Sequence, residues 1–280
     1  MKNLRLATKR HLLRVIDRSS LLVYLLRLYR RNRIVKSYLR PSRQISRRWI
    51  TSVTEDSNFY YGLEKENRHH LIHFVSTTLK VDYLEITKYF EEIERNEYLN
   101  EKMTGYFSKL QLRHSLPEIG RRIAWYALIR QTKPRLVIET GVHHGVGGLV
   151  ICLALQANEN EGFVGEYLGV DIDPSAGNII DSNVFKFAKI IFSDSHEFLV
   201  NFPSLCDFFI HDSDHSQEFE FKEYSLIYNK LSERGLILSD NAHATAALRE
   251  FSEKCDRDFY YFREVPKDHW YPGAGLGVSI

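Results

Sequence analysis

The chain has 280 residues, of which 44% are apolar, 13% aromatic and 26% charged. This composition excludes a disordered tail and a collagen-like rod, and it provides enough apolar material for a globular core. The formal net charge of +2 is an average over two unlike parts. Residues 1–50 hold 15 Lys and Arg and one acid, whereas the other 230 residues hold 23 bases and 35 acids. We therefore expect a basic arm on an acidic body.

The cysteines and the apolar runs indicate the compartment. Cys152, Cys206 and Cys255 lie far apart without a CxxC pair, which argues against a zinc cluster or a disulfide framework and fits a reducing cytosol. The clean apolar run at 21–26 is shorter than the ~20 residues of a spanning helix or the ~7 of a secretory signal core. We expect a cytoplasmic protein.

The basic arm, residues 1–50, has the pattern of an amphipathic helix. Apolar residues such as Leu22, Leu25, Leu26 and Tyr29 recur at helical spacing between arginines. Such a helix can pack on the body or on a second copy of the chain, lie on an anionic membrane surface, or bind nucleic acid. Packing is the commonest fate. Nucleic acid is the least favoured partner because no aromatic side chains are spaced for base stacking.

Residues 51–120 are predicted to form a helical region, and the helical pattern continues to about residue 130. The segment at 88–103 is rich in helix formers, and RRIAWYALIRQT at 121–132 is strongly periodic. We expect residues 51–120 to act as a substrate or lid region. The loop at 267–275 is a second candidate for acceptor selection, in which Trp270 and Tyr271 can either stack on a sugar face or pack inside.

The third region, residues 121–280, alternates short apolar runs with helical ones after Lys133. This alternation predicts an α/β fold with a doubly wound, Rossmann-like parallel sheet. The five runs lie at 135–139, 166–171, 188–193, 206–211 and 235–240. Two further runs, at 259–265 and 275–280, are separated by a loop too short for a crossover helix. We therefore expect the last two strands to pair as an antiparallel hairpin.

Ligands of such sheets bind beyond the carboxyl ends of the strands. The first strand ends in a glycine-rich turn, ETGVHHGVGG, whose notable residues are Glu139, Gly141, Gly145 and Gly147. Glycines permit positive φ and a close approach of backbone to a ligand. The second strand ends at Asp171, where a carboxylate can accept hydrogen bonds from ribose hydroxyls. The dinucleotide fingerprint GxGxxG is incomplete, because Val150 occupies its third glycine position.

The glycine turn and the acid after it resemble the ExGxxxG turn and second-strand acid of class I S-adenosylmethionine-dependent methyltransferases. The resemblance covers residues 121–280 and implies S-adenosylmethionine as cofactor. It also implies a seven-stranded sheet of order 3-2-1-4-5-7-6, with the last inserted strand antiparallel, in agreement with the predicted hairpin. Asp194 and Ser195 follow the third strand, where this superfamily contacts the adenine ring. They can equally cap the following helix.

Strands four and five end in IHDSDH (210–215) and SDNAH (239–243). Asp212, Asp240 and Asn241 match the residues that hold magnesium in cation-dependent O-methyltransferases similar to catechol O-methyltransferase. The surrounding sequence looks most like a bacterial branch that includes sugar O-methyltransferases, in which a His often follows the first metal Asp by three residues. His215 stands at that position. The resemblance implies Mg²⁺ as Lewis acid and template, with His215 as general base.

The sequence thus predicts a metal-assisted, S-adenosylmethionine-dependent O-methyltransferase. Its acceptor is expected to be a small-molecule or glycan hydroxyl, on a sugar or glycoside of a polysaccharide or natural-product pathway. Two alternatives stay open at this point. One is a nicotinamide-dependent oxidoreductase on a similar sheet, and the other is a non-catalytic docking module that keeps the fold.

Overall fold

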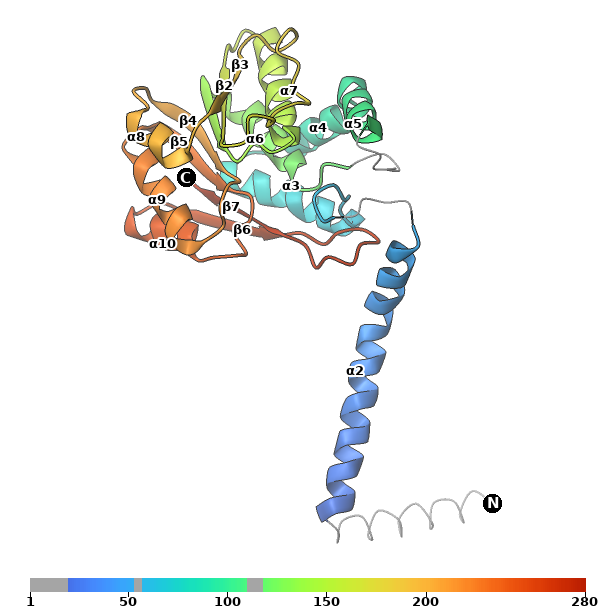
Figure 1. The fold of residues 1–280 in the computed structure, drawn as a ribbon. Coiled ribbons are helices and arrows are strands. Elements are labelled where there is room, and N and C mark those ends of the chain that lie inside the picture. Colours follow the sequence, from blue (N-terminus) through green and yellow to red (C-terminus); the bar gives the residue numbers. More distant parts are fainter. Residues whose placement is uncertain (1–19, 53–56, 110–117) are drawn as a thin grey trace. The chain divides into compact units, whose positions relative to one another are not determined.

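The structure is a computed structural model that describes residues 20–52, 57–109 and 118–280 (Figure 1). The chain divides into two compact units, Met1–Ser52 and Val53–Ile280. The first contains the predicted basic arm, of which residues 1–19 lie outside the described part. Within the predicted helical region, residues 53–56 and 110–117 also lie outside it.

The first unit contributes one long helix, α2 (Ser20–Ile50). It carries nine Lys and Arg and no acidic residue. The six residues after Ser20 are all apolar or aromatic, and the basic residues begin at Arg27. The predicted helix is therefore confirmed over the described part of the arm. Among the described residues, no helix is long and apolar enough to cross a membrane.

The second unit is built on a seven-stranded sheet with the order β3-β2-β1-β4-β5-β7-β6. The predicted apolar runs form the strands, and several, such as AKIIF of β3 and FYYFR of β6, are rich in the β-branched or aromatic residues that favour strands. The strands are β1 (Leu136–Thr140), β2 (Glu166–Asp171), β3 (Ala188–Phe192), β4 (Cys206–His211), β5 (Leu231–Ser239), β6 (Phe259–Arg263) and β7 (Gly275–Ser279). The first five are parallel, and β7 is inserted between β5 and β6 antiparallel to both. The predicted order and hairpin are confirmed.

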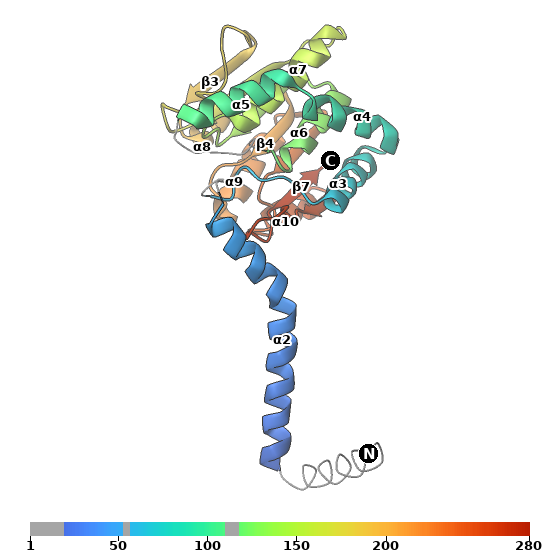
Figure 2. The ribbon, with the colours of Figure 1, turned by 90° about the vertical axis from the view of Figure 1, so that its right-hand side faces the viewer.

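Helices cover both faces of this sheet (Figures 1 and 2). One face is covered by α8 (Ser195–Asn201), α9 (Gln217–Tyr228) and α10 (Ala247–Lys254). The other is covered by α6 (Arg122–Thr132), α7 (Val146–Asn160) and, at β6, α3 (Lys65–Leu79), with α4 (Tyr83–Glu94) and α5 (Glu97–Lys109) outside them. Apolar side chains surround both α6 and α7, as expected for helices buried between two layers.

The helices α3 to α5 share one apolar core with α6 and α7. Phe90 of α4 and Trp125 of α6 belong to this core, and both side chains are fully buried. The described residues 57–109 of the predicted helical region therefore belong to the same compact unit as the sheet. Its role as a substrate or lid region stays a prediction.

Candidate functional site

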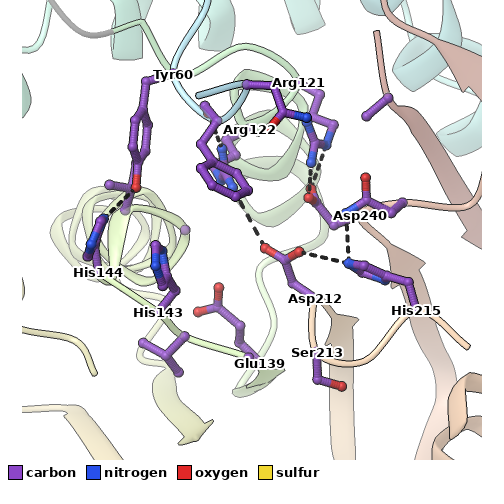
Figure 3. A pocket seen from close by; sticks show the side chains of 18 of the residues that line it. Tyr60, Arg121, Arg122, Glu139, His143, His144, Asp212, Ser213, His215 and Asp240 are labelled. Atoms are coloured by element: carbon purple, nitrogen blue, oxygen red, sulfur yellow. Dashed lines mark hydrogen bonds and ion pairs between the residues drawn. The ribbon is translucent and has the colours of Figure 1, made fainter. Parts of the chain in front are cut away.

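A cavity of about 520 Å³ lies beyond the carboxyl ends of the central strands. The strand register explains its position. Thr140 of β1 pairs with His211 of β4, and His211 pairs with Ser239 of β5, so these three strands end at one edge. The chain leaves that edge through Gly141, Asp212 and Asp240, which all line the cavity. Figure 3 shows the acids and histidines that the edge brings together.

Close packing within the protein requires glycine at two positions of the turn after β1. Gly141 has φ of +83°, and a Cβ at this position would lie 2.1 Å from the carbonyl oxygen of Asp212. A Cβ on Gly147 would lie 2.4 Å from Oε1 of Glu139. Both glycines line the cavity, whereas Gly145 begins α7 outside the lining. The turn therefore holds the β1 and β4 loops together at the site.

Glu139 is the acid at the end of β1, and only 1% of it is exposed. The hydroxyl of Tyr167 donates a hydrogen bond to its Oε2. Burial raises the pKa of Glu139 to about 8, against the opposing effects of the Tyr167 hydrogen bond and the Arg122 charge. A buried acid with a raised pKa that lines a cavity is a feature of functional sites.

The other predicted cofactor residues, Asp171, Asp194 and Ser195, are not among the residues that line the cavity. Asp171 ends β2 and accepts hydrogen bonds from the backbone N–H of His143 and of Asp173, each at 2.9 Å. Asp194 caps α8 by accepting from the backbone N–H of Glu197 at 3.0 Å, and Ser195 is buried in the first turn. The capping interpretation of Asp194 is therefore confirmed, and the adenine contact stays a prediction.

Asp240 is fully buried and paired with Arg121, the residue before α6. The Nε of Arg121 donates to Oδ1 of Asp240 at 2.7 Å, and Nη2 donates to Oδ2 (Figure 3). Nη1 of the same guanidinium donates to Glu264 at 2.9 Å. Burial would raise the pKa of Asp240, but Arg121 and Arg122 outweigh it and lower that pKa to about 2.

Asp212 and Asn241 lie on either side of His215. The Nδ2 of Asn241 donates to Nε2 of His215 at 2.8 Å, and the same Nε2 lies 3.8 Å from Oδ1 of Asp212. Nη2 of Arg122 lies 3.7 Å from Oδ2 of Asp212. Burial and the negative charge of Asp240 raise the pKa of Asp212 well above its ordinary value. His215 therefore faces the cavity between an acid and an amide.

The predicted magnesium ligands come together, but their arrangement does not fit Mg²⁺. Both oxygens of Asp240 are bound by Arg121, and Asn241 turns its amide nitrogen toward His215. Mg²⁺ needs oxygen ligands and near-octahedral geometry. The Arg121 guanidinium supplies the positive charge that the resemblance assigns to the metal, and the Arg122 guanidinium adds a second.

Sequence reasoning missed Arg121, Arg122 and Tyr60, which all line the cavity. One signal was present. Two arginines stand at the start of a strongly apolar helix, where the helix dipole disfavours cations unless acids pair with them. Tyr60 hydrogen bonds with Nδ1 of His144 at 2.8 Å. Burial and the neighbouring His143 lower the pKa of His144 to about 4, so His144 is a neutral lining residue near pH 7.

Comparisons with known proteins agree with this geometry. Residues 138–242 match the family model of a methyltransferase domain. The fold is similar to that of the O-methyltransferase TomG from Streptomyces achromogenes, involved in tomaymycin synthesis and solved in complex with SAM. The TM-score is 0.51 at 13% identity, over 66% of this chain and 90% of that chain.

A second similar structure is the O-methyltransferase from Bacillus cereus in complex with SAH. It matches with a TM-score of 0.49 at 11% identity, over 66% of this chain and 91% of that one. No curated protein matches the sequence. The family match spans the strand ends that form the cavity, and the strand order is the one expected for this class. The chain therefore carries a methyltransferase domain, matched over residues 138–242, on a Rossmann-like sheet with the predicted strand order.

Proposed function

We propose that the protein methylates a hydroxyl group, with His215 as the base that removes the hydroxyl proton. The observation that carries the proposal is the position of the His215 ring. Its Nε2 faces the cavity beside Asp212, and its Nδ1 lies 3.4 Å from Oε1 of the fully buried Glu220. A carboxylate this close to an imidazole favours proton uptake on the opposite nitrogen through its negative charge.

Residues around the glycine turn would hold the cofactor. Glu139, Gly141 and Gly147 line the cavity at the end of β1, and Asp171 ends the neighbouring β2. Each carboxylate oxygen of Asp171 accepts one backbone hydrogen bond and so retains capacity for a ribose hydroxyl. Asp194 is the proposed adenine neighbour. When bound, S-adenosylmethionine supplies an electrophilic methyl group on a sulfonium.

The chain's own charges support removal of the proton. An alcohol is a weak nucleophile until its proton leaves. His215 takes that proton on Nε2, the nitrogen that accepts the hydrogen bond from Asn241 in the structure. The guanidinium of Arg122 lies 3.7 Å from Asp212 on the same side of the cavity, and its positive charge stabilises a developing alkoxide. These roles need no metal ion.

A sugar or glycoside is the acceptor class that the lining supports best. Phe59, Tyr60 and Tyr271 present aromatic rings beside the polar groups of the cavity. Aromatic rings offer apolar faces to sugars, and the neighbouring polar groups can bind hydroxyls. Tyr271 lines the cavity, which supports its predicted role in stacking on a sugar face. Trp270 is 46% exposed, lies outside the lining residues, and contacts the rings of His269 and Tyr271.

The two alternative functions have less support. Hydride transfer would use the dinucleotide fingerprint, but Val150 at its third glycine position is fully buried inside α7. A docking module without catalysis would not need His215 and Asp212 to converge on one cavity.

Two measurements on the full-length protein test the proposal. Calorimetry should show binding of S-adenosylhomocysteine, and transfer of labelled methyl should be measured with a panel of glycosides. We expect His215→Gln to slow transfer by about 10²- to 10⁴-fold while leaving binding of S-adenosylhomocysteine unchanged. The matched control is His70→Gln, on the exposed side of α3. Failure to bind the nucleoside would refute the cofactor role, and an unchanged rate in His215→Gln would refute the base.

A further inference from the structure

Three buried polar atoms face one another behind the cavity without a hydrogen-bond partner. They are Nε2 of His211 at the end of β4, Nδ1 of His215 in the following loop, and Oε1 of Glu220 in the first turn of α9. The side chains of His211 and Glu220 are fully buried. Oε1 of Glu220 lies at ion-pair distance from both ring nitrogens without a hydrogen bond to either, and three buried polar atoms that converge in this way suggest a shared cation.

The spacing of these atoms fits a single metal ion. Oε1 of Glu220 lies 3.5 Å from Nε2 of His211 and 3.4 Å from Nδ1 of His215. The three atoms lie within 4.8 Å of one another. Zn²⁺ binds nitrogen and oxygen ligands at about 2.0–2.2 Å in tetrahedral geometry, which places neighbouring ligand atoms about 3.4 Å apart. These distances are long for hydrogen bonds and suitable for two ligands of one ion.

Each of the three groups is held from its other side. In the supporting hydrogen bonds, Nδ1 of His211 donates to Oε2 of Glu223 at 2.6 Å, Oγ1 of Thr245 donates to Oε2 of Glu220 at 2.6 Å, and Nδ2 of Asn241 donates to Nε2 of His215 at 2.8 Å. Histidine ligands of metals usually have their second ring nitrogen held by a carboxylate or another polar group. The three side chains are therefore held in place around the common point before any ion arrives.

We propose that His211, His215 and Glu220 form a binding site for one divalent transition-metal ion of the Zn²⁺ type. Two imidazoles and one carboxylate favour Zn²⁺, Co²⁺ or Ni²⁺ over Mg²⁺, which prefers oxygen ligands alone. The site is separate from the predicted Mg²⁺ trio of Asp212, Asp240 and Asn241. With three protein ligands, it leaves a fourth position for water or a substrate oxygen.

The site has a consequence for catalysis, and this step alone rests on the proposed function. An ion on Nδ1 of His215 leaves the ring proton on Nε2, so the residue can no longer accept a proton from the acceptor hydroxyl. Asn241 can follow this change by rotating its amide to present oxygen to Nε2. Bound Zn²⁺ should therefore inhibit methyl transfer.

The binding test needs no methyl acceptor. Full-length protein is freed of metals with a chelator, desalted, and titrated with Co²⁺ while the visible absorption of tetrahedral Co²⁺ is followed. Calorimetry with Zn²⁺ gives the stoichiometry. We expect one ion per chain, with binding weakened at least about tenfold in Glu220→Gln and in His215→Gln. The matched control is Glu218→Gln, an exposed acid in the same first turn of α9, which should bind like the wild type.

Circular dichroism and binding of S-adenosylhomocysteine show whether each variant is folded. Glu220 is a buried residue, so His215→Gln, at a half-buried position, gives the second independent measurement. Absence of Co²⁺ and Zn²⁺ binding in the wild type would overturn the metal site. The proposed methyl transfer would be unaffected, because Glu220 would then pair with protons on the two imidazoles and not with a metal ion. Binding that persists unchanged in both variants would also overturn it. Binding without inhibition of transfer would refute the catalytic consequence.

Discussion

The guanidinium of Arg121 and the carboxylate of Asp240 form a bidentate ion pair in the interior, with 2.7 Å between Nε and Oδ1. The pair joins the start of α6 to the end of β5 across 119 positions of the sequence. Glu264 accepts from the same guanidinium and from the hydroxyl of Tyr61. One arginine thus balances two buried carboxylates beside the cavity.

Removal of this arginine should destabilise the protein strongly. Arg121→Met leaves Asp240 and Glu264 buried without their cation, and we expect the free energy of unfolding to fall by about 3–5 kcal/mol. Urea denaturation followed by circular dichroism measures the change. The control is Arg95→Met, which breaks an exposed ion pair with Glu91 and should leave the midpoint almost unchanged. Equal midpoints for the two variants would contradict the central role of Arg121.

Chelation of divalent ions should not abolish methyl transfer. Because Arg121 binds both oxygens of Asp240, that carboxylate offers Mg²⁺ no open oxygen in the structure. We expect full activity after treatment with EDTA and desalting, and increased activity if Zn²⁺ occupied the site at His215 beforehand. Loss of activity that added Mg²⁺ restores would show that the Arg121 pair opens to admit the metal.

The sheet could be predicted from the sequence to within a residue or two at most strand ends. The run at 135–139 is β1 (Leu136–Thr140), and the last two runs are the antiparallel β6 and β7. Short apolar runs and loop lengths specify such a topology locally, so the strand ends, and with them the cavity lining at Glu139, Asp212 and His215, were found.

The partners of those residues could not be predicted, because they come from distant segments. Nothing near Asp240 in the sequence indicates that Arg121 will bind it. The spacing of His211, His215 and Glu220 is local, but their convergence depends on how α9 packs against β4, which periodicity does not specify. Asp194 shows the opposite case, since a helix cap is a local feature that the sequence did indicate.

Glu139 should make stability depend on pH. Its pKa in the folded protein is about 8, above the ordinary 4.5, because the side chain is buried. Between these values the folded state holds a proton that the unfolded chain has released, so this contribution to stability is complete below the lower pKa and is lost as pH rises through about 8. The loss is up to about 1.4 kcal/mol per pH unit.

The variant Glu139→Gln removes this titration and can still accept the hydrogen bond from Tyr167. Its melting temperature should fall less than that of the wild type between about pH 5 and pH 8. Thermal unfolding at a series of pH values measures the difference. Glu233→Gln changes an exposed acid in β5 and should follow the wild-type curve. Parallel curves for wild type and Glu139→Gln would show that Glu139 is already ionised in the folded protein.

The basic helix α2 should bind anionic membranes peripherally. Arg33, Lys36, Arg40, Arg43 and Arg47 recur every three or four residues, which places them along one side of the helix. Leu21, Tyr24, Leu25 and Leu28 form an exposed apolar segment near its start. Helices that carry both apolar and basic residues in this way lie at the interface of anionic bilayers. Each Lys or Arg near the membrane surface contributes about fivefold in affinity.

Flotation of the full-length protein with vesicles that contain phosphatidylserine tests this expectation. We expect the triple variant Arg33→Gln, Arg40→Gln, Arg47→Gln to bind at least about a hundredfold more weakly, and high salt to weaken the wild type similarly. Vesicles of phosphatidylcholine alone are the control and should bind little of either protein. If the wild type does not float, sedimentation analysis of the same two proteins distinguishes the remaining alternatives. A dimer of the wild type that the triple variant loses would show that the helix packs on a second copy, and a monomer would show that it packs on its own chain. Binding to the anionic vesicles would instead favour a lipid-linked glycan as the methyl acceptor, because the arm would then hold the catalytic unit next to such a substrate.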